Sequence, residues 1–130
     1  VMSIGLMPGS RLPAHSTSMG RVLLAAMPDP EARRIIEASD LSPRTRFSLT
    51  DPDEIMMQVQ SARVRGYAMV DQEVEISLRS LAVPVLNSKG AVVAALNTGM
   101  AATQPDPAEL VESYLPALLK VQAGIARILG

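Results

Sequence analysis

Three segments of this chain carry the same helix-start signal, and together they limit the folds that the chain can adopt. Each places an aspartate at a helix N-cap and a proline at the first helical position: Asp29-Pro30, Asp51-Pro52 and Asp106-Pro107. Glu54 and Glu109 follow at the spacing of a capping box, with Asp in place of Ser or Thr. We therefore expect helices that end near Ser39, at Arg65 and near Gly130.

Two of these helices carry further signals along their length. Gly66 predicts a left-handed residue that closes the second helix. The third helix keeps apolar residues at helical spacing, but Pro116 interrupts it. Because proline removes a backbone hydrogen bond inside a helix, we expect a kink or a break at this position.

Residues 11–27 form a polar turn that opens directly into an apolar helix. The turn contains His15, the single histidine of the chain, followed by small polar residues at 16–18. Apolar residues at helical spacing then predict a helix from Thr17 or Ser18 to residue 27: Met19, Val22, Leu23 and Ala26. The first N–H groups of a helix lack intrahelical acceptors and lie at the positive end of its dipole. This helix start is therefore a candidate site for a carboxylate or a phosphate.

Between Gly66 and Asp106 the pattern changes from helical to strand-like. Residues 67–73, 79–86 and 91–98 predict strands, residues 87–90 a hairpin turn, and residues 1–7 a further strand. The apolar run at 91–98 is typical of a central strand covered on both faces, whereas Pro84 suits an edge or a bulge. This order of elements predicts an α+β fold in which helices pack against an antiparallel sheet.

The composition excludes several classes of protein. A chain of 130 residues suits one domain with one core. Lys and Arg number 12 against 13 Asp and Glu, so this chain has no excess of positive charge with which to bind nucleic acid by itself. It has no cysteine, and no apolar run approaches the roughly 20 residues that span a bilayer. Because the chain begins inside a predicted strand and shows no signal peptide, we expect a fragment of a longer cytoplasmic protein.

Catalysis and metal binding have weak support. His15 lies beside Ser16 and Ser18, but a GxSxG elbow is absent, and hydroxyls at a helix start are typical caps. Three carboxylates alternate and would share one face of a strand: Asp71, Glu73 and Glu75. They could hold a hard cation together with His15, or they could pair with Arg79. Since no recognised ligand spacing occurs, we expect no catalytic residue, no metal and no cofactor.

A small-molecule site has better support. The chain has eight methionines but only three aromatic residues, two tyrosines and one phenylalanine. Methionine is flexible, so this composition favours an apolar interior that can adapt its shape. Polar groups that could read a ligand lie at the helix start, at Ser80 and at Asn97. An unsatisfied buried amide costs about 1–3 kcal/mol, so Asn97 in its apolar strand needs a ligand, a water molecule or a neighbouring loop as its partner.

The stretches RLPAHSTSMGRVLLAAMP and GYAMVDQEVEISLRSLAVPVLNSKGAVVAALNTG, with the closing helix, resemble the effector-binding domain of IclR-family bacterial transcription regulators. The chain is most similar to the subgroup that governs aromatic-acid catabolism through the β-ketoadipate pathway. The resemblance implies one GAF/profilin-like domain over residues 1–130, with a curved antiparallel sheet flanked by helices. It also implies homodimers or homotetramers, and a winged helix-turn-helix, N-terminal to this chain, that binds DNA.

The resemblance further implies an effector pocket between the sheet and the first helix: Ser18, Met19, Val70 or Asp71, Ser80, Asn97 and Gly99. Two departures from the glyoxylate-binding branch, at residues 18–19 and at 97 and 99, mean that its ligand is not carried over. The chain is accordingly predicted to sense a small carboxylate, either aromatic or dicarboxylic. The alternatives are an oligomerisation module without a working pocket and a small hydrolase.

Overall fold

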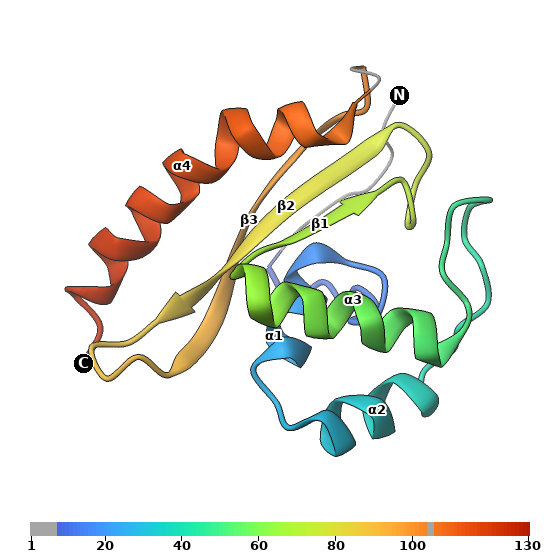
Figure 1. Ribbon diagram of the computed structural model, residues 1–130, viewed down its shortest axis with the longest axis horizontal. Coiled ribbons are helices and arrows are strands. Elements are labelled where there is room, and N and C mark those ends of the chain that lie inside the picture. Colours follow the sequence, from blue (N-terminus) through green and yellow to red (C-terminus); the bar gives the residue numbers. More distant parts are fainter. Residues whose placement is uncertain (1–7, 104–105) are drawn as a thin grey trace.

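The computed structural model describes residues 8–103 and 106–130. These residues form four helices and three strands in an α+β arrangement, which confirms the predicted fold class (Figure 1). The elements are α1 (Ser18–Ala25), α2 (Asp29–Glu37), α3 (Pro52–Arg65), β1 (Ala68–Asp71), β2 (Leu78–Leu86), β3 (Val92–Ala101) and α4 (Pro107–Ala126). The strand predicted at residues 1–7 lies outside the described residues.

The sheet is antiparallel in the order β1-β2-β3, and helices pack on both of its faces. Successive residues of a strand point to opposite faces. On β2, Leu81 and Val83 therefore face α4, where they form one apolar cluster with Leu110 and Leu118. Ala82 faces the other way, toward α1 and α3. Figure 1 shows the same division, with α4 along one side of the strands and α1 and α3 on the other.

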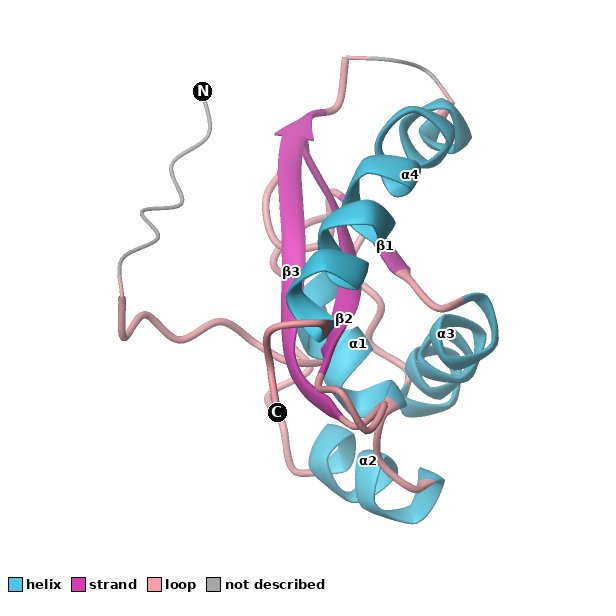
Figure 2. Ribbon diagram, turned by 90° about the vertical axis from the view of Figure 1, so that its left-hand side faces the viewer, coloured by secondary structure: helices cyan, strands magenta, loops and turns pink. Residues whose placement is uncertain are grey.

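A third apolar cluster joins the three N-terminal helices. Leu24 of α1 is 2% exposed, and Ile36 of α2 and Ile55 of α3 are fully buried. Burial of one such side chain contributes about 1.5–3 kcal/mol. Helix α2 packs against α3 and α1 and lies below the sheet in Figure 2. Val22 of α1 packs on the sheet, whereas Leu24 packs on α2 and α3. The position of α1 is therefore fixed from two sides, by the sheet and by the two neighbouring helices.

Local signals set the ends of α3 and the start of α4. The carboxylates of Asp51 and Asp106 accept hydrogen bonds from the N–H groups of Asp53 and Ala108, at 3.3 and 2.9 Å. Gly66 closes α3 with a φ of +83°, the left-handed conformation that its position predicted.

Two details of the predicted helices differ from the structure. α4 continues through Pro116, so the break that was one of two expected outcomes does not occur; Leu110 and Leu118, on either side of the proline, are both held against the sheet. Asp29 is the first residue of α2 rather than its N-cap. Its carboxylate instead binds Arg63 of α3 at 2.7 Å.

The prediction that the apolar run at 91–98 is a central strand was wrong for the described sheet. There β2 is central and β3 lies at the edge, with 53% of Val93 exposed. An apolar run indicates that other elements cover the faces of a strand. Which strands pair with it depends on contacts between residues distant in sequence. Pro84 lies on β2 beyond the end of β1, which pairs only with residues 79–82. The Pro84 carbonyl accepts a hydrogen bond from Gln122 of α4 at 2.6 Å, so this side of β2 is a local edge.

The three alternating carboxylates do not share a strand face, because β1 ends at Asp71 and residues 72–77 form a loop. Asp71 pairs with Arg79 at 2.7 Å, and Glu73 pairs with Arg21 at 2.7 Å. The described residues contain no group of three or more His, Asp or Glu side chains placed to hold a metal ion.

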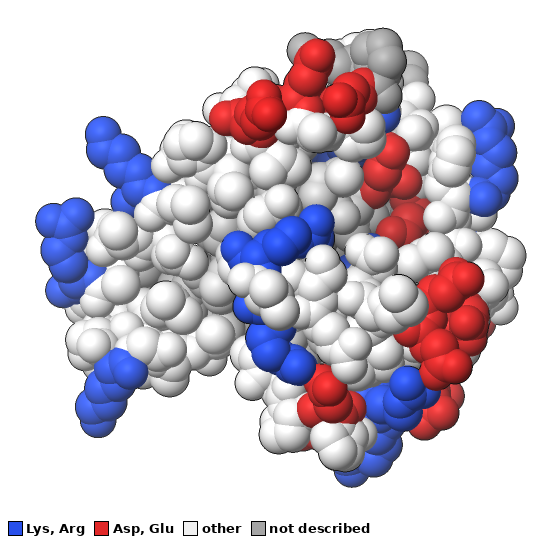
Figure 3. Space-filling view, viewed as in Figure 1, with Lys and Arg blue, Asp and Glu red and all other residues white. Residues whose placement is uncertain are grey.

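Charged side chains are dispersed over the surface that Figure 3 shows. Lys and Arg residues are scattered there, and acidic residues gather near the starts of α3 and α4. Within the described part of the chain, no helix combines the length and the apolar character needed to cross a membrane.

Candidate ligand-binding site

The first turn of α1 is built by contacts that its own sequence supplies. Thr17 is the N-cap; its Oγ1 accepts a hydrogen bond from the Gly20 N–H at 3.1 Å and donates to the carbonyl four residues earlier at 2.8 Å. Gly20 lies against the backbone of Ala14, where a Cβ atom would collide with the Ala14 carbonyl. The preceding segment therefore folds back beside the helix, and the N–H groups of Ser18 and Met19 keep no intrahelical acceptor.

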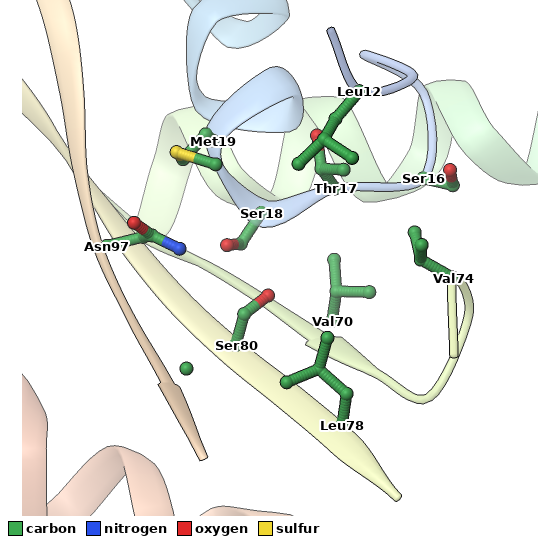
Figure 4. A pocket seen from close by; sticks show the side chains of 11 residues that line it. Leu12, Ser16, Thr17, Ser18, Met19, Val70, Val74, Leu78, Ser80 and Asn97 are labelled. Atoms are coloured by element: carbon green, nitrogen blue, oxygen red, sulfur yellow. The ribbon is translucent and has the colours of Figure 1, made fainter. Parts of the chain in front are cut away.

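A cavity of about 340 Å³ lies between this helix start and the sheet. Its volume falls in the range of small-molecule sites. The segment 12–19 forms one wall, and the three strands with the 72–77 loop form the others (Figure 4). The lining residues are Leu12, Ser16, Thr17, Ser18, Met19, Val70, Val74, Leu78, Ser80, Asn97 and Gly99.

Strand pairing brings the residues of the sheet wall together. Val70 of β1 lies beside Ser80 of β2, and Ser80 lies beside Gly99 of β3. Asn97 precedes Gly99 by two residues, so both lie on the same face of the sheet. Figure 4 shows the polar ends of Ser18, Ser80 and Asn97 directed into a common space. One small ligand could therefore contact all three polar side chains.

The cavity offers polar groups but no charged ones. No described lining residue is charged, and positions 1–7 and 104–105 carry no charged side chain in the sequence. Ser18 is fully buried and Ser16 is 3% exposed, and neither hydroxyl oxygen has a hydrogen-bond partner among the described residues. A buried polar group without a partner costs about 1–3 kcal/mol, so a ligand that bonds to these hydroxyls would be favoured.

Six of the predicted site residues lie on the cavity wall: Ser18, Met19, Val70, Ser80, Asn97 and Gly99. The structure distinguishes Val70 from Asp71, its neighbour on β1, because their side chains point to opposite faces. Asp71 lies on the face opposite to the cavity, where its carboxylate accepts a hydrogen bond from Arg79 Nε at 2.7 Å.

Sequence reasoning missed five lining residues: Leu12, Ser16, Thr17, Val74 and Leu78. A weak signal for two of them was available, because Val74 and Leu78 are apolar residues in a stretch that also carries three carboxylates. The position of Leu12 had no such signal, since it depends on how closely the backbone of Ala14 approaches Gly20.

His15 lies outside the cavity, in a separate polar hollow of about 470 Å³ that Arg11, Asp40 and Arg44 also line. The His15 side chain is 5% exposed, and its Nδ1 atom has no hydrogen-bond partner among the described residues. Burial, and secondly the charge of Arg21, hold the pKa of His15 below its usual value of 6.5. The described residues thus show no hydrogen-bonded pair of imidazole and serine such as a hydrolase uses.

Known proteins identify the family of this chain. Residues 2–127 match the family model described as the bacterial transcriptional regulator IclR C-terminal domain. The chain belongs to the IclR family. This IclR domain is 44% identical over 119 residues to the Pca regulon regulatory protein of Pseudomonas putida, across 92% of the chain and 41% of the relative. It is 35% identical over 118 residues to the p-hydroxybenzoate hydroxylase transcriptional activator of Acinetobacter baylyi, across 91% of the chain and 44% of the relative.

Solved IclR-family structures share the fold. The inducer-binding domain of PobR from Acinetobacter, a double mutant in complex with 3-hydroxybenzoic acid, superposes with a TM-score of 0.90 at 31% identity, over 99% of this chain and 74% of that one. A transcriptional regulator from Rhodococcus sp. RHA1 superposes with a TM-score of 0.89 at 36% identity, over 98% of this chain and 51% of that one. These likenesses confirm the predicted family and its similarity to regulators of aromatic catabolism. The chain spans less than half the length of the two curated relatives.

Proposed function

We propose that this IclR domain senses a small carboxylate, an aromatic acid or a dicarboxylate, within a longer transcription regulator. The observation that carries the proposal is the uncharged cavity at the start of α1, where the unpartnered hydroxyl of Ser18 lies with Ser80 and Asn97 in a largely apolar space. The 3-hydroxybenzoic acid complex of PobR, a protein of the same fold, supports an acid of this size.

The proposed mechanism assigns a role to each wall of the cavity. The N–H groups of Ser18 and Met19 hold the carboxylate at the positive end of the α1 dipole. Ser80 and Asn97 read hydroxyl or keto groups on the rest of the ligand. Val70 and the other apolar lining residues exclude water and contact the carbon skeleton.

Magnitudes indicate moderate affinity for one site. A ligand of about ten heavy atoms that gains about −0.5 to −0.8 kcal/mol per atom binds with −5 to −8 kcal/mol, which corresponds to high-micromolar to micromolar dissociation constants. Moving a two-state equilibrium from 1:99 to 99:1 needs about 5.5 kcal/mol of differential binding. Coupled sites in an oligomer would supply this more readily than one site.

A melting-temperature screen with hydroxybenzoates and dicarboxylates tests the proposal. A ligand at about 100 times its dissociation constant stabilises the folded state by about 2.7 kcal/mol, which raises Tm by on the order of 10 °C for a domain of this size. Ser80→Leu and Asn97→Leu should abolish the shift, since each places an apolar side chain in the cavity. Ser113→Leu on the exposed side of α4 should keep it. If no acid in the panel shifts the wild-type Tm, the sensor proposal fails for those acids.

The remaining features of the proposal concern the whole regulator. We propose that residues 1–130 are its single effector domain, that a winged helix-turn-helix N-terminal to them binds the operator, and that the protein is a cytoplasmic non-enzyme. The curated relatives are regulators of transcription, which supports this reading.

We also propose that the domain forms homodimers or homotetramers. Large apolar side chains are exposed on α4, on β3 and just after α4, among them Val121 at 48%, Val93 at 53% and Ile128 at 82%. Figure 3 shows a broad uncharged area on the side where α4 lies. The same surface favours the second candidate function, an oligomerisation module without a working pocket. Light scattering gives the oligomeric state, and the melting screen separates the two functions.

A further inference from the structure

We propose that a buried ion pair, Arg21–Glu73, is a positioning pair that holds residues 72–77 as a closed wall over the cavity. We name residues 72–77 the strap. The proposal rests on the proposed function, because it assigns the strap to the site where the carboxylate binds. It goes beyond that function in naming the contact that controls access to the site.

The pair is fully enclosed and has bidentate geometry. Arg21 is 2% exposed and Glu73 is 7% exposed. The two terminal guanidinium nitrogens donate to the two carboxylate oxygens at 2.8 and 2.7 Å. Glu73 also accepts a hydrogen bond from the N–H of Leu49 at 3.1 Å. By contrast, the ion pairs Arg33–Asp53, Arg63–Asp29 and Arg79–Asp71 each have at least one side chain that is more than a third exposed.

The pair joins two walls of the cavity that are far apart in sequence. Arg21 Nε donates to the carbonyl of His15 at 2.9 Å, directly before the lining residue Ser16. Glu73 directly precedes Val74, which lines the cavity from the strap. One guanidinium therefore holds the helix-side wall through its Nε and the strap through its terminal nitrogens.

The strap has the features of a segment held in place by such contacts. Gln72 and Ser77, at its two ends, have φ values of +60° and +73°, in a region that residues other than glycine rarely adopt. Such conformations persist where surrounding contacts over-determine them. Those contacts are present: Ser48 Oγ donates to the Glu73 carbonyl at 2.5 Å, and Thr45 Oγ1 donates to the Gln72 carbonyl at 2.6 Å.

Loss of one charge should open the strap rather than leave it in place. A buried charge without its partner is unfavourable, so Arg21 in a Glu73→Gln variant gains by reaching water. The nearest route is outward movement of the strap, which relaxes Gln72 and Ser77 and removes Val74 from the cavity wall. Replacing both partners with apolar residues of similar size, as in Arg21→Met/Glu73→Leu, should preserve stability while losing the bonds to His15 and Leu49.

Thiol labelling tests strap closure without any ligand. The chain has no cysteine, so Ser80→Cys places a single thiol on the cavity wall, and Val59→Cys places one in the separate cluster of helices. Glu73→Gln is then added to each of these two variants. The factor by which it raises the labelling rate should be about ten times larger for the thiol at position 80 than for the thiol at position 59. Asp53→Asn, which breaks the exposed pair with Arg33, should leave both rates near their starting values. Equal acceleration at both positions, or no acceleration at 80, overturns the proposal.

A second experiment measures how tightly the effector binds. With 3-hydroxybenzoate or another acid that the wild type binds, Glu73→Gln should weaken binding about tenfold in calorimetry, and Asp53→Asn should not. Unchanged affinity in Glu73→Gln overturns the role of the strap in binding. If the wild type binds no acid, the proposed function fails, while the labelling rates still decide strap closure. If Glu73→Gln does not fold, both experiments use Arg21→Met/Glu73→Leu instead. Because this variant lacks the bonds to His15 and Leu49, it should also show faster labelling at position 80 than at position 59 and weaker binding.

Discussion

At the scale of single residues, Gly20 is the described glycine that leaves the least room for a side chain. A Cβ atom on this residue would meet the carbonyl oxygen, Cα and carbonyl carbon of Ala14, all of them backbone atoms that cannot rotate away. This contact holds the segment before α1 against the helix, and the cavity wall follows from it. The glycine therefore supports the site without touching a ligand.

Gly20→Ala should lower the free energy of unfolding by about 3 kcal/mol, because inserting an atom against fixed backbone forces the two segments apart. Gly124→Ala is the matched control, since nothing lies within 4 Å of its added Cβ and alanine favours helix α4. That control should gain about 0.5–1 kcal/mol. Urea unfolding measures both. A loss in Gly20→Ala no larger than the change in Gly124→Ala would contradict the close approach.

His15 should make stability depend on pH. Its pKa is lowered in the folded state by burial and then by Arg21, so below the usual value of 6.5 the unfolded state binds the proton more readily. The contribution of His15 is therefore present above pH 6.5 and is lost as the pH falls through that value toward the lowered folded pKa. Urea unfolding at about pH 7.5 and about pH 5 should show a larger loss for the wild type than for His15→Gln. Equal losses would show that His15 does not cause the dependence.

At the scale of elements, the helices and the hairpin of β2 and β3 were predictable, and the place of β3 in the sheet was not. The bounds of α3 followed from Asp51, Pro52 and Gly66, which act within a few residues of their own position. The place of β3 at the edge of the described sheet depends on which strands meet, and no local pattern records that. Asp29 shows a limit of local signals as well, because Arg63, from another helix, binds its carboxylate.

The N-cap of α3 gives a direct test at this scale. Asp51→Ala should lower the free energy of unfolding by about 1 kcal/mol, since it removes the acceptor for the Asp53 N–H. Asp51→Ser keeps an acceptor and should retain most of the stability. Chemical denaturation of both variants measures the difference. If alanine and serine are equally destabilising, the hydrogen bond at the cap is not the cause.

At the scale of the whole molecule, the sheet residues of the candidate site were predicted chiefly from the family resemblance, and strand pairing explains why four of them lie together. Val70, Ser80, Asn97 and Gly99 lie together because paired antiparallel strands place residues in register. The rest of the wall comes from the 72–77 loop and the segment before α1, whose positions depend on the Arg21–Glu73 pair and on Gly20. These contacts span many residues in sequence, so periodicity and composition could not reveal them.

The most direct test of the account is a crystal structure of the domain with the acid that raises its Tm the most. The account predicts the ligand in the cavity between α1 and the sheet, with carboxylate oxygens about 3 Å from the N–H groups of Ser18 and Met19. It also predicts Ser80 or Asn97 within hydrogen-bond distance of a ligand oxygen. A carboxylate bound instead in the hollow lined by Arg11 and Arg44, with the cavity empty, would contradict it.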